Sequence, residues 1–481
     1  NEINPNDFWL EKNNKKSDHN HKFLWLSLVN RKTDEKNIQK IIYLWIINYS
    51  TFKSRIWETS TLSSRVISWM LNVDIIINKG TFEFKKIFFQ NIILQCNHLK
   101  KNFKFEKDPI KKIEILTALI LSGVIFKEYE DNFKIGIKEL EKFVNSHFDK
   151  DGFALSRSIN DLIIFTKYLL LCRENIKEAQ RYLPEFLDDI IKKNLECIKF
   201  FQTPDNRLPL FNGTYENDLN SFEKYLETVK IDKKGKKNVI GNIFFAKSKN
   251  QLFYLDIGGP PSKNLSKNYQ SGPLSFEYYL DGLKIITNCG FGKNISAKAE
   301  LISRLTASQS TLTINDTTVT KFERNRLINR VFGNSIKNTF RTNEFKIQYD
   351  KYLTGCSISH DGYEKNFGCV HKREIYLDHE GDKLKGLDHI LKKNDGIPIR
   401  YVFRFHLNPE LTAIKTMSGS SALIQISKNK SLIFTIKDEN IEIENGIYLA
   451  GSKILDNTCI TVSGNLVNKS KSFAWEIKRK I

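Results

Sequence analysis

The sequence predicts an α+β chain of two segregated domains, a helical domain in residues 1–232 followed by a large antiparallel β-sandwich in residues 238–481. In the first half, apolar residues recur every three or four positions, as they do in amphipathic helices. In the second half, short segments rich in β-branched and aromatic residues alternate with turn residues. A lysine-rich polar break at 233–237 separates the two patterns. Runs of helices followed by runs of strands indicate segregated domains rather than interleaved β-α-β units.

The helical domain is predicted from seven segments with short polar joints between them. These are residues 23–49, 62–77, 87–99, 110–126, 135–148, 162–172 and 190–201. Sequential helices with short connections pack as antiparallel hairpins, which form either a solenoid or a closed ring. No fixed-period repeat is found, which disfavours a regular solenoid.

The β-sandwich is predicted from eleven short segments with turn signals such as Asp281-Gly282 between them. They are residues 243–246, 252–255, 274–280, 284–287, 310–314, 346–349, 373–377, 401–406, 422–426, 432–436 and 459–463.

The composition excludes a disordered or collagen-like chain, because 40% of the residues are hydrophobic and 12% are aromatic. A net charge of +20 favours a polyanionic partner. Lys, Asn and Ile are abundant throughout, so a nucleotide bias of the genome explains the charge equally well. Because no zinc-finger, RNP or helix-turn-helix signature occurs, we expect no nucleic-acid partner. The oligomeric state is left open.

The seven cysteines form no C-x-x-C pair, so we expect buried hydrophobic residues rather than a disulfide framework or a zinc finger. No apolar run approaches the roughly 18 residues that span a bilayer, so we expect a soluble chain without a transmembrane segment. Because the chain opens with Asn1, we expect that a natural start and any signal peptide precede it.

Several short motifs narrow this architecture further. In the second half they are YQSGPLSFE at 269–277, IITNCG at 285–290, RLTASQSTL at 304–312, HDGY at 360–363, HKR at 371–373 and RFHLNP at 404–409. In the first half they are FLWL at 23–26, DGFALSR at 151–157 and LFNG at 210–213. Their order and spacing resemble heparinase II/III-like proteins, in particular the proteobacterial envelope branch of that family.

The resemblance implies an α/α toroid, often incomplete, followed by an antiparallel β-sandwich. It also implies a lyase that cleaves an acidic, uronate-containing polysaccharide or oligosaccharide, located in the periplasm or cell envelope, or otherwise in the cytoplasm. Such a lyase must neutralise the uronate carboxylate, remove the C5 proton with a Tyr or His, and return a proton to the C4 oxygen. Glycoside hydrolysis instead needs two carboxylates at a defined separation, for which the sequence has no signature.

Residues of the helical half that match the family's site are Tyr215, Asn212, Arg157, Ser158 and Asn160. By resemblance, Tyr215 is the catalytic acid or base, and Asn212 is its substrate-binding neighbour. Either Ser158 or Asn160 stands where the family neutralises the carboxylate, although Ser is also a common helix N-cap. Arg157 is expected to bind the sugar carboxylate through two hydrogen bonds.

In the sandwich half, His360 is expected to take part in catalysis, and residues of the neighbouring motifs to contact the substrate. The expected contacts are Arg304, Tyr363, His371 and Arg373. Arg404 and His406 alternate with apolar residues on one strand, which favours a structural role for both.

Gln270 and Gln309 occupy positions where the family commonly has histidines. Glutamine can hydrogen-bond a sugar but cannot titrate, so both are expected to bind substrate. Some relatives hold zinc in the sandwich with His and Asp, where this chain has Gln270 and Asn288; we therefore predict no metal and no other cofactor. The two amides also favour an alternative, a non-catalytic glycan-binding or envelope-biogenesis protein on the same scaffold.

Overall fold

The computed structural model describes residues 8–9, 19–29, 35–52, 55–216, 219–228, 237–325, 329, 334–393, 397–467 and 469–480. Contacts divide the chain into two compact units. The helical unit comprises Asn1–His147 and Ile163–Ile191, and the sandwich unit comprises Phe148–Leu162 and Lys192–Ile481. The boundary at 232 and residues 233–236 of the polar break lie outside the described residues, so the domain limits stay a prediction.

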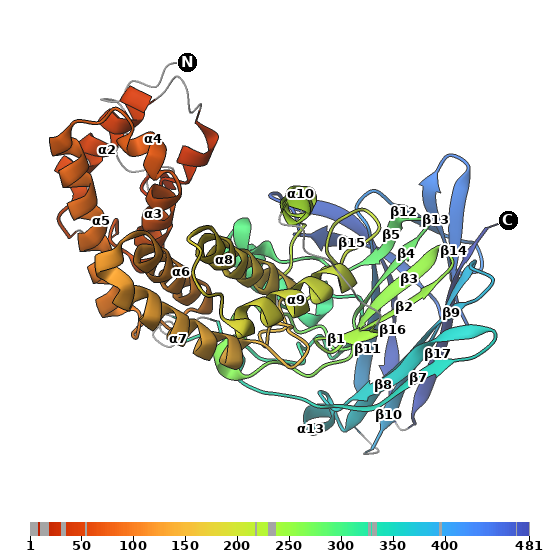
Figure 1. The fold of residues 1–481 in the computed structure, drawn as a ribbon. Coiled ribbons are helices and arrows are strands. Elements are labelled where there is room, and N and C mark those ends of the chain that lie inside the picture. Colours follow the sequence, from red (N-terminus) through yellow and green to blue (C-terminus); the bar gives the residue numbers. More distant parts are fainter. Residues whose placement is uncertain are drawn as a thin grey trace. The chain divides into compact units, whose positions relative to one another are not determined.

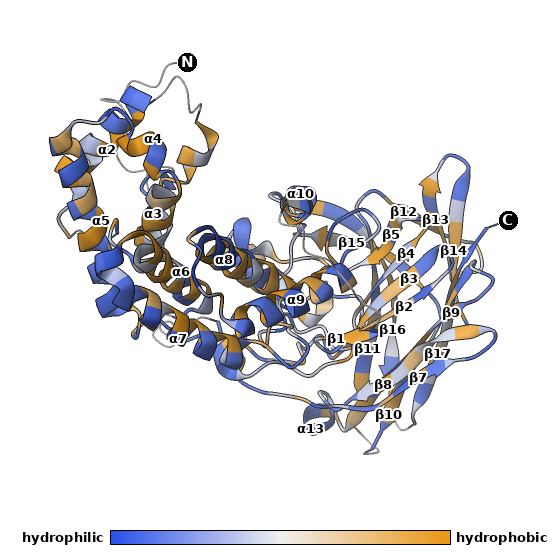
Figure 2. Cartoon of the chain, in the orientation of Figure 1, coloured by the Kyte–Doolittle hydropathy of each residue, from blue (hydrophilic) through white to orange (hydrophobic). Residues whose placement is uncertain are grey.

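The helical unit is built from helices joined by short loops (Figures 1 and 2). They are η1 (Leu24–Leu28), α2 (Glu35–Tyr49), α3 (Thr59–Leu71), α4 (Val73–Ile77), α5 (Phe82–Asn102), α6 (Pro109–Ile125), η2 (Lys127–Tyr129), α7 (Glu130–His147), most of α8 (Ile159–Glu178) and the start of α9 (Glu185–Phe200). Helices α3 and α6 are buried on all faces over most of their length.

Helices α6 and α7 form one of the predicted antiparallel hairpins. Asp108 caps α6 by accepting hydrogen bonds from the amides of Ile110 and Lys111. Gly136 of α7 lies so close to Ile120 of α6 that a Cβ would come within 2.6 Å of the Ile120 side chain. The two helices therefore pack closely because a glycine removes the side chain between them.

The sandwich unit contains the rest of α8 and α9, a further helix α10 (Asn220–Thr228), and the strands. The strands are β1 (Val239–Ile240), β2 (Ile243–Ser248), β3 (Gln251–Asp256), β4 (Phe276–Leu280), β5 (Leu283–Thr287), β6 (Leu312–Ile314), β7 (Thr342–Tyr349), β8 (Leu353–His360), β9 (Cys369–Asp378), β10 (Lys383–Lys392), β11 (Ile399–Leu407), β12 (Thr412–Lys415), β13 (Ser421–Ser427), β14 (Lys430–Ile436), β15 (Glu442–Tyr448), β16 (Leu455–Leu466) and β17 (Lys471–Arg479). Short helices η3 (Lys263–Leu265), η4 (Gly292–Asn294), α11 (Ala297–Ser303), η5 (Thr306–Ser308) and α13 (Glu364–Phe367) lie in its loops.

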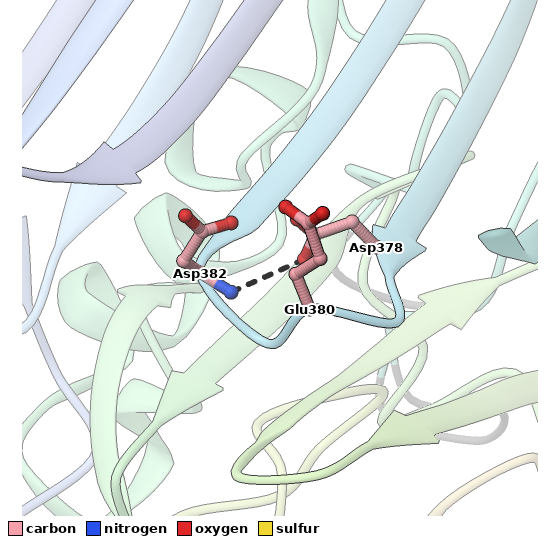
Figure 3. A group of neighbouring side chains, drawn as sticks. All are labelled: Asp378, Glu380 and Asp382. Atoms are coloured by element: carbon pink, nitrogen blue, oxygen red, sulfur yellow. Dashed lines mark hydrogen bonds between the residues drawn. The ribbon is translucent and has the colours of Figure 1, made fainter. Parts of the chain in front are cut away.

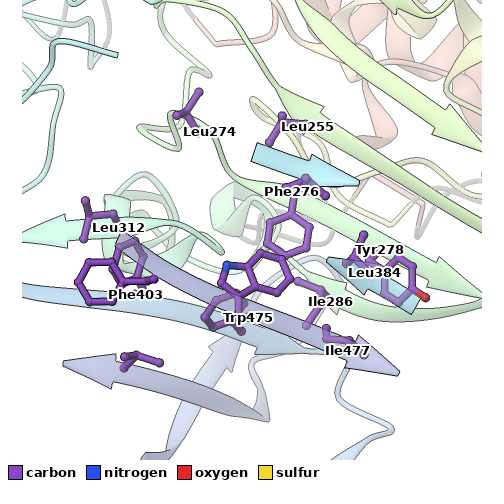
Figure 4. Packing of buried hydrophobic residues seen from close by; sticks show 14 of the residues in the cluster. Leu255, Leu274, Phe276, Tyr278, Ile286, Leu312, Leu384, Phe403, Trp475 and Ile477 are labelled. Carbon is purple, nitrogen blue, oxygen red and sulfur yellow. The ribbon is translucent and has the colours of Figure 1, made fainter. Parts of the chain in front are cut away.

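The described strands form two antiparallel sheets. One has the order β1-β2-β3-β4-β5-β11-β16-β15, with β6 paired to β11, and the other has the order β12-β13-β14-β17-β10-β9-β8-β7. Their inner faces share one core, in which the rings of Phe276 from the first sheet and Trp475 from the second stack with centroids 5.6 Å apart (Figure 4). Two sheets with a shared apolar core define the predicted β-sandwich.

All eleven predicted segments overlap strands, but others were missed, among them β8, β10 and β17. In β10 the inward positions include Gly386 and Asp388, which hide the apolar alternation that marks a strand. Gly386 is required there because a Cβ would come within 2.0 Å of the Trp475 ring.

Residues that precede the strands in sequence pack within the sandwich unit. The Asn194 amide of α9 donates to the carbonyl of Gly152 at 2.8 Å, and the Tyr254 hydroxyl of β3 donates to the carbonyl of Phe200 at 2.9 Å. The start of α8, the end of α9 and the loop after α9 therefore belong to the same compact unit as the sheets. The residues predicted for the site can consequently be compared within a single unit.

Candidate functional site

A sharp turn shapes the loop that carries Tyr215, here called the Tyr215 loop (residues 211–216). Asn212 and Gly213 both have left-handed backbones, with φ of 47° and 83°. Asn tolerates this conformation better than most residues, and Gly adopts it without strain. At Gly213 a Cβ would also come within 2.6 Å of the Asn268 side chain. The Asn-Gly pair is therefore needed both for the turn and for the close approach to Asn268.

The Tyr215 loop is fastened on both sides of Tyr215. On the N-terminal side, the amide of Gly213 donates to Oε1 of Gln270 at 2.9 Å. On the C-terminal side, the amide of Glu216 donates to the carbonyl of Ala450 at 2.8 Å. The hydroxyl of Tyr448 also donates to the Glu216 carboxylate at 2.6 Å. The backbone on either side of Tyr215 is thus held by the sandwich.

Within this fastened loop, two polar groups are left without partners. Tyr215 is half-buried, and its hydroxyl makes no hydrogen bond to any described residue. Asn212 is 2% exposed, and its Nδ2 is buried without a hydrogen-bond partner in the described chain. An unsatisfied buried donor costs about 1–3 kcal/mol, so such groups call for an explanation such as a ligand or a catalytic role. Both groups therefore have unused hydrogen-bonding capacity, and the hydroxyl of Tyr215 belongs to a partly exposed residue.

Gln270 and Gln309 converge on one backbone carbonyl. Nε2 of Gln270 donates to the carbonyls of Ser303 at 2.7 Å and Gly290 at 3.0 Å, and Nε2 of Gln309 donates to Ser303 at 2.8 Å. Both side chains are 2% exposed. Their hydrogen-bonding capacity is therefore used within the protein, and not displayed to a substrate as we predicted.

The hydrogen bonds around Gln270 also test whether this region could hold a zinc ion. Oε1 of Gln270 and Oδ1 of Asn288 already accept hydrogen bonds, from the amides of Gly213 and Ser310. Burial raises the pKa of the neighbouring Cys289 thiol to about 12, which disfavours the thiolate that binds zinc. These residues do not fit a zinc site, and the absence of zinc stays a prediction.

Arg157, just before α8, binds residues at the end of β3 and in the adjacent loops. Its guanidinium forms a buried ion pair with Asp256 at 2.6 Å and donates to the carbonyls of Gly259 at 2.8 Å and Asn242 at 3.2 Å. Arg157 itself has a left-handed backbone, with φ of 61°. Because the guanidinium already binds a carboxylate of the protein, this geometry does not fit the predicted contact with a sugar carboxylate.

Ser158 caps α8 and lies next to the Tyr215 loop. Its Oγ accepts from the amide of Asp161 at 3.2 Å, and it would lie 3.4 Å from a Cβ placed on Gly213. Asp161 in turn accepts from Nδ2 of Asn268 at 3.2 Å. The structure thus brings together Ser158, the Asn212-Gly213 turn and Gln270, and their role in a shared site stays a prediction. Asn160, 8% exposed, lies in the first turn of α8.

His371 and Arg373 belong to a different cluster, here called the Asp388 hub (Asp388, His371, Arg373 and Trp475). Asp388 accepts from Nε2 of His371 at 2.7 Å, from Nε and Nη2 of Arg373 at 2.7 and 3.1 Å, and from Nε1 of Trp475 at 2.8 Å. Burial would raise the pKa of Asp388, but Arg373 and His371 outweigh it and hold that pKa well below its usual range. His371, Arg373 and Asp388 are each 0% exposed.

His360 contacts the ring of His371, with centroids 5.3 Å apart, and is also 0% exposed. Burial holds its pKa well below the ordinary value, so the ring is neutral. Nδ1 accepts from the amide of Gly362 at 3.1 Å, which occupies the lone pair that a base would use. The predicted catalytic role of His360 does not fit this position.

Tyr363 and Arg304 are also enclosed. The hydroxyl of Tyr363 donates to the carbonyl of Leu312 at 2.8 Å, and Arg304 donates to the carbonyls of Tyr269 and Ser266 at 2.8 and 2.9 Å. Tyr363 is 1% exposed and Arg304 is 0% exposed. These donors are used within the protein, as are those of Arg373 and Nε2 of His371, which corrects the substrate contacts predicted for Arg304, Tyr363, His371 and Arg373.

Sequence reasoning missed Asn268, Glu216, Tyr448 and Ala450, which hold or flank the Tyr215 loop. Asn268 and Glu216 stand beside named motifs, so adjacency alone could have indicated them. Tyr448 and Ala450 lie more than 200 positions further along the chain and carry no local signal.

Among the described residues, one carboxylate group has metal-like spacing: Asp378, Glu380 and Asp382 in the β9–β10 turn (Figure 3). Asp378 accepts hydrogen bonds from the amides of Gly381, Asp382 and Lys383 at 3.0–3.2 Å. The side chain of Asp378 therefore closes the turn, which explains an acidic residue here without a metal ion. No described helix is long and apolar enough to cross a membrane.

The helical region and the β-sandwich together have the fold of solved polysaccharide lyases. Residues 239–476 match the family model described as Heparinase II/III-like, C-terminal. Residues 239–476 therefore carry a heparinase II/III-like C-terminal domain, as the motifs predicted, and the predicted fold class is confirmed. No curated protein matches the sequence.

Solved structures of lyases have the same fold. A heparinase III has a TM-score of 0.76 at 16% identity, over 99% of this chain and 79% of that protein. The heparan sulfate lyase HepC of Pedobacter heparinus has a TM-score of 0.72 at 15% identity, over 99% and 78%. A chondroitinase AC lyase has a TM-score of 0.50 at 9% identity, over 98% and 82%. At these identities the comparisons show the fold, which is that of a polysaccharide lyase.

Proposed function

We propose that the protein is a polysaccharide lyase that cleaves a uronate-containing glycan by β-elimination, with Tyr215 as the proton-transfer group. The observation that carries the proposal is the free phenol of Tyr215 on a loop whose backbone is fastened on both sides. A catalytic group must be available to the substrate and also held in position. Among the sequence-predicted candidates, Tyr215 combines an exposed surface with a titratable group that has no partner in the described chain.

Asn212 is the proposed carboxylate-binding residue. Its Nδ2 is an unpartnered donor three residues from Tyr215 in the chain. A hydrogen bond from this amide would stabilise the charge that moves onto the uronate carboxylate when the C5 proton leaves. Asn160 at the start of α8 is a second amide that could share this role, and Ser158 lies beside the turn at Gly213.

The reaction then needs one proton to move twice. Deprotonated Tyr215 takes the proton from C5, and the electrons of the C5–H bond form the C4–C5 double bond. The C4–O bond breaks, and the departing oxygen takes the proton from Tyr215. One residue can serve both steps when the C5 proton and the C4 oxygen lie on the same face of the sugar. This route does not require the enclosed His360.

The loops around the site carry a charge that suits an acidic glycan. Segments 258–272 and 290–304, which contribute Gln270 and Ser303, contain five basic residues and one acidic residue, Glu300. Lys263, Lys293 and Lys298 of these loops are exposed. Cations on loops beside a site raise the local concentration of a polyanion.

A non-catalytic glycan-binding or envelope-biogenesis protein is the second candidate. It is favoured by the amides at 270 and 309, because neither can move a proton. A periplasmic or envelope location remains part of either proposal.

The experiment is ultraviolet absorbance of the unsaturated uronate, measured with purified protein on a panel of acidic glycans. Heparan sulfate, chondroitin sulfate, alginate and bacterial uronate polymers would form the panel, and neutral glycans would be the control. A lyase produces absorbing product from at least one acidic glycan. Binding of an acidic glycan without product, measured in parallel by calorimetry, would instead support the second candidate.

A further inference from the structure

Gln270 makes a hydrogen bond that links the sandwich directly to the turn of the Tyr215 loop. Its Oε1 accepts from the amide of Gly213 at 2.9 Å. Gly213 follows Asn212 and precedes Tyr215 by two residues, so this bond lies between the two groups proposed to contact the substrate. The bond is enclosed, because Gln270 is 2% exposed and Gly213 is buried.

The orientation of the Gln270 amide is determined by its surroundings. Its Nε2 has two hydrogens, and carbonyls lie at 2.7 Å (Ser303) and 3.0 Å (Gly290) to accept them. A flipped amide would place the Nε2 donor against the amide of Gly213 and the Oε1 acceptor against two carbonyls. The side chain therefore has a single satisfied orientation, in which its oxygen points at Gly213.

A histidine could not make the same three bonds. A neutral imidazole has one donor and one acceptor, whereas this position uses two donors and one acceptor. Gln270 thus has a chemical function in this chain that does not depend on titration or on a metal. Its three bonds join β-sandwich loops that carry Gly290 and Ser303 to the loop that carries Tyr215.

We propose that Gln270 is a positioning residue that holds Asn212 and Tyr215 in their working geometry through the amide of Gly213. The catalytic part of the proposal rests on the proposed lyase function, whereas the structural part does not. If this bond is lost, the N-terminal side of the loop is released while Glu216 stays bound to Ala450 and Tyr448. Displacement of a reacting group by about 1 Å can lower a rate by about 10²-fold.

Gln309 provides a matched control. It is equally buried and donates to the same carbonyl of Ser303 at 2.8 Å, but it makes no hydrogen bond to the Tyr215 loop. Gln270→Met and Gln309→Met both replace a buried amide by an apolar chain of similar length. A general loss of stability should affect the two variants alike, whereas release of the loop should follow only Gln270→Met.

The primary experiment is hydrogen exchange of the peptide that contains Gly213, measured by mass spectrometry on the full chain. We expect exchange at Gly213 to rise at least about tenfold in Gln270→Met, because the amide loses its partner, and to change less than about threefold in Gln309→Met. Unchanged protection of Gly213 in Gln270→Met, or an equal rise in both variants, would overturn the proposal.

A second variant keeps the test valid if Gln270→Met does not fold. In Gln270→Glu, a protonated carboxyl can accept from Gly213 and donate to a carbonyl, whereas a carboxylate is repelled by the carbonyls of Ser303 and Gly290. Protection of Gly213, corrected for intrinsic exchange, should therefore fall as pH rises through the pKa of the new carboxyl, and wild-type protein should lack this dependence. A variant whose protection does not change with pH would contradict the proposed bond.

Activity separates this proposal from the proposed function. If wild-type protein forms unsaturated product, Gln270→Met should lower kcat by about 10–100-fold with KM changed less than about threefold. Gln309→Met should keep kcat within about threefold. Faster exchange at Gly213 in Gln270→Met with unchanged kcat would reject the catalytic role of Gln270. It would still support the hydrogen bond between Gln270 and Gly213 in the wild-type protein. Absence of product from wild-type protein would reject the lyase function, while the exchange data would still decide the structural part.

Discussion

The Tyr215 loop and the Asp388 hub are both polar clusters of the sandwich unit, and they differ in burial and in how their acidic groups are bonded. In the hub, Asp388 accepts four hydrogen bonds, and the three charged or titratable members are 0% exposed. Nδ1 of His371 in the hub is itself buried without a partner in the described chain. In the loop, the Tyr215 hydroxyl and Nδ2 of Asn212 have no partners in the described chain. The sequence motifs predicted a role in the site for residues of both clusters.

The difference teaches how to separate structural from functional polar residues. A buried charge is tolerated when every partner is present, and it then stabilises one arrangement of the core. A polar group with unused capacity at a partly exposed position is available to a ligand. The predictions below test polar groups of both kinds, from the largest expected effect to the smallest.

The largest effect is expected in the hub. Asp388→Asn removes the charge that faces Arg373 and should lower the free energy of unfolding by about 3–5 kcal/mol, because a buried guanidinium loses its counter-ion. Urea unfolding of the full chain would measure this loss. The control is Asp316→Asn, since Asp316 pairs with Arg400 on the surface with both side chains 57% exposed. That change should cost less than about 1 kcal/mol. Equal costs for the two variants would contradict a structural hub.

The next effect concerns pH. Burial lowers the pKa of His406 to about 4, so the unfolded chain, with a pKa of about 6.5, binds the proton first as pH falls. The contribution of His406 to the free energy of unfolding is complete above about pH 6.5. It is lost as pH falls from about 6.5 to about 4, and the total loss is roughly 3 kcal/mol. His406→Gln retains a donor for the Ala307 carbonyl and removes the titration. Its stability should fall less steeply over this range, and a slope equal to that of wild type would contradict the assignment.

A smaller effect is expected at Asn212. Asn212→Ala removes the donor proposed for the uronate carboxylate and should lower kcat/KM by about 10–100-fold, since a hydrogen bond to a charged group contributes about 1.5–3 kcal/mol. The exposed Asn264 offers a control, and Asn264→Ala should be near wild type. If Asn212→Ala keeps wild-type kcat/KM, the carboxylate is bound elsewhere, and Asn160 becomes the candidate.

The smallest effect is expected at Arg207, which pairs with Glu216 at 2.9 Å at the edge of the Tyr215 loop. Its side chain is 47% exposed, so solvent screens the pair. Arg207→Ala should lower the free energy of unfolding by less than about 1 kcal/mol, because Tyr448 still binds Glu216. A thermal scan that shows a loss above about 2 kcal/mol would mean that Arg207, rather than Tyr448 and Ala450, fastens this side of the loop.

The sequence predicted the order of helices and strands because periodicity is a local property. It did not predict β10, since Asp388 and Gly386 occupy core positions for reasons set by Arg373 and Trp475 on neighbouring strands. The LFNG motif indicated Asn212 and the nearby Tyr215 as candidates, and their roles stay predictions. We also expected His360, His371 and Arg373 in the site, because a motif does not show whether a polar side chain faces the core or the substrate. That distinction depends on cross-strand pairing, such as His360 opposite His371.

The central claim is that the free phenol of Tyr215 moves the proton and that the enclosed His360 does not. The most direct test is single-turnover formation of unsaturated product by Tyr215→Phe and His360→Asn, compared with wild type on the same glycan. Tyr215→Phe removes only the hydroxyl and should lower the rate by about 10²–10⁴-fold. His360→Asn keeps an acceptor for the Gly362 amide and should stay within about threefold once the folded fraction is matched. The opposite pattern, a near wild-type rate for Tyr215→Phe and a large loss for His360→Asn, would contradict the account.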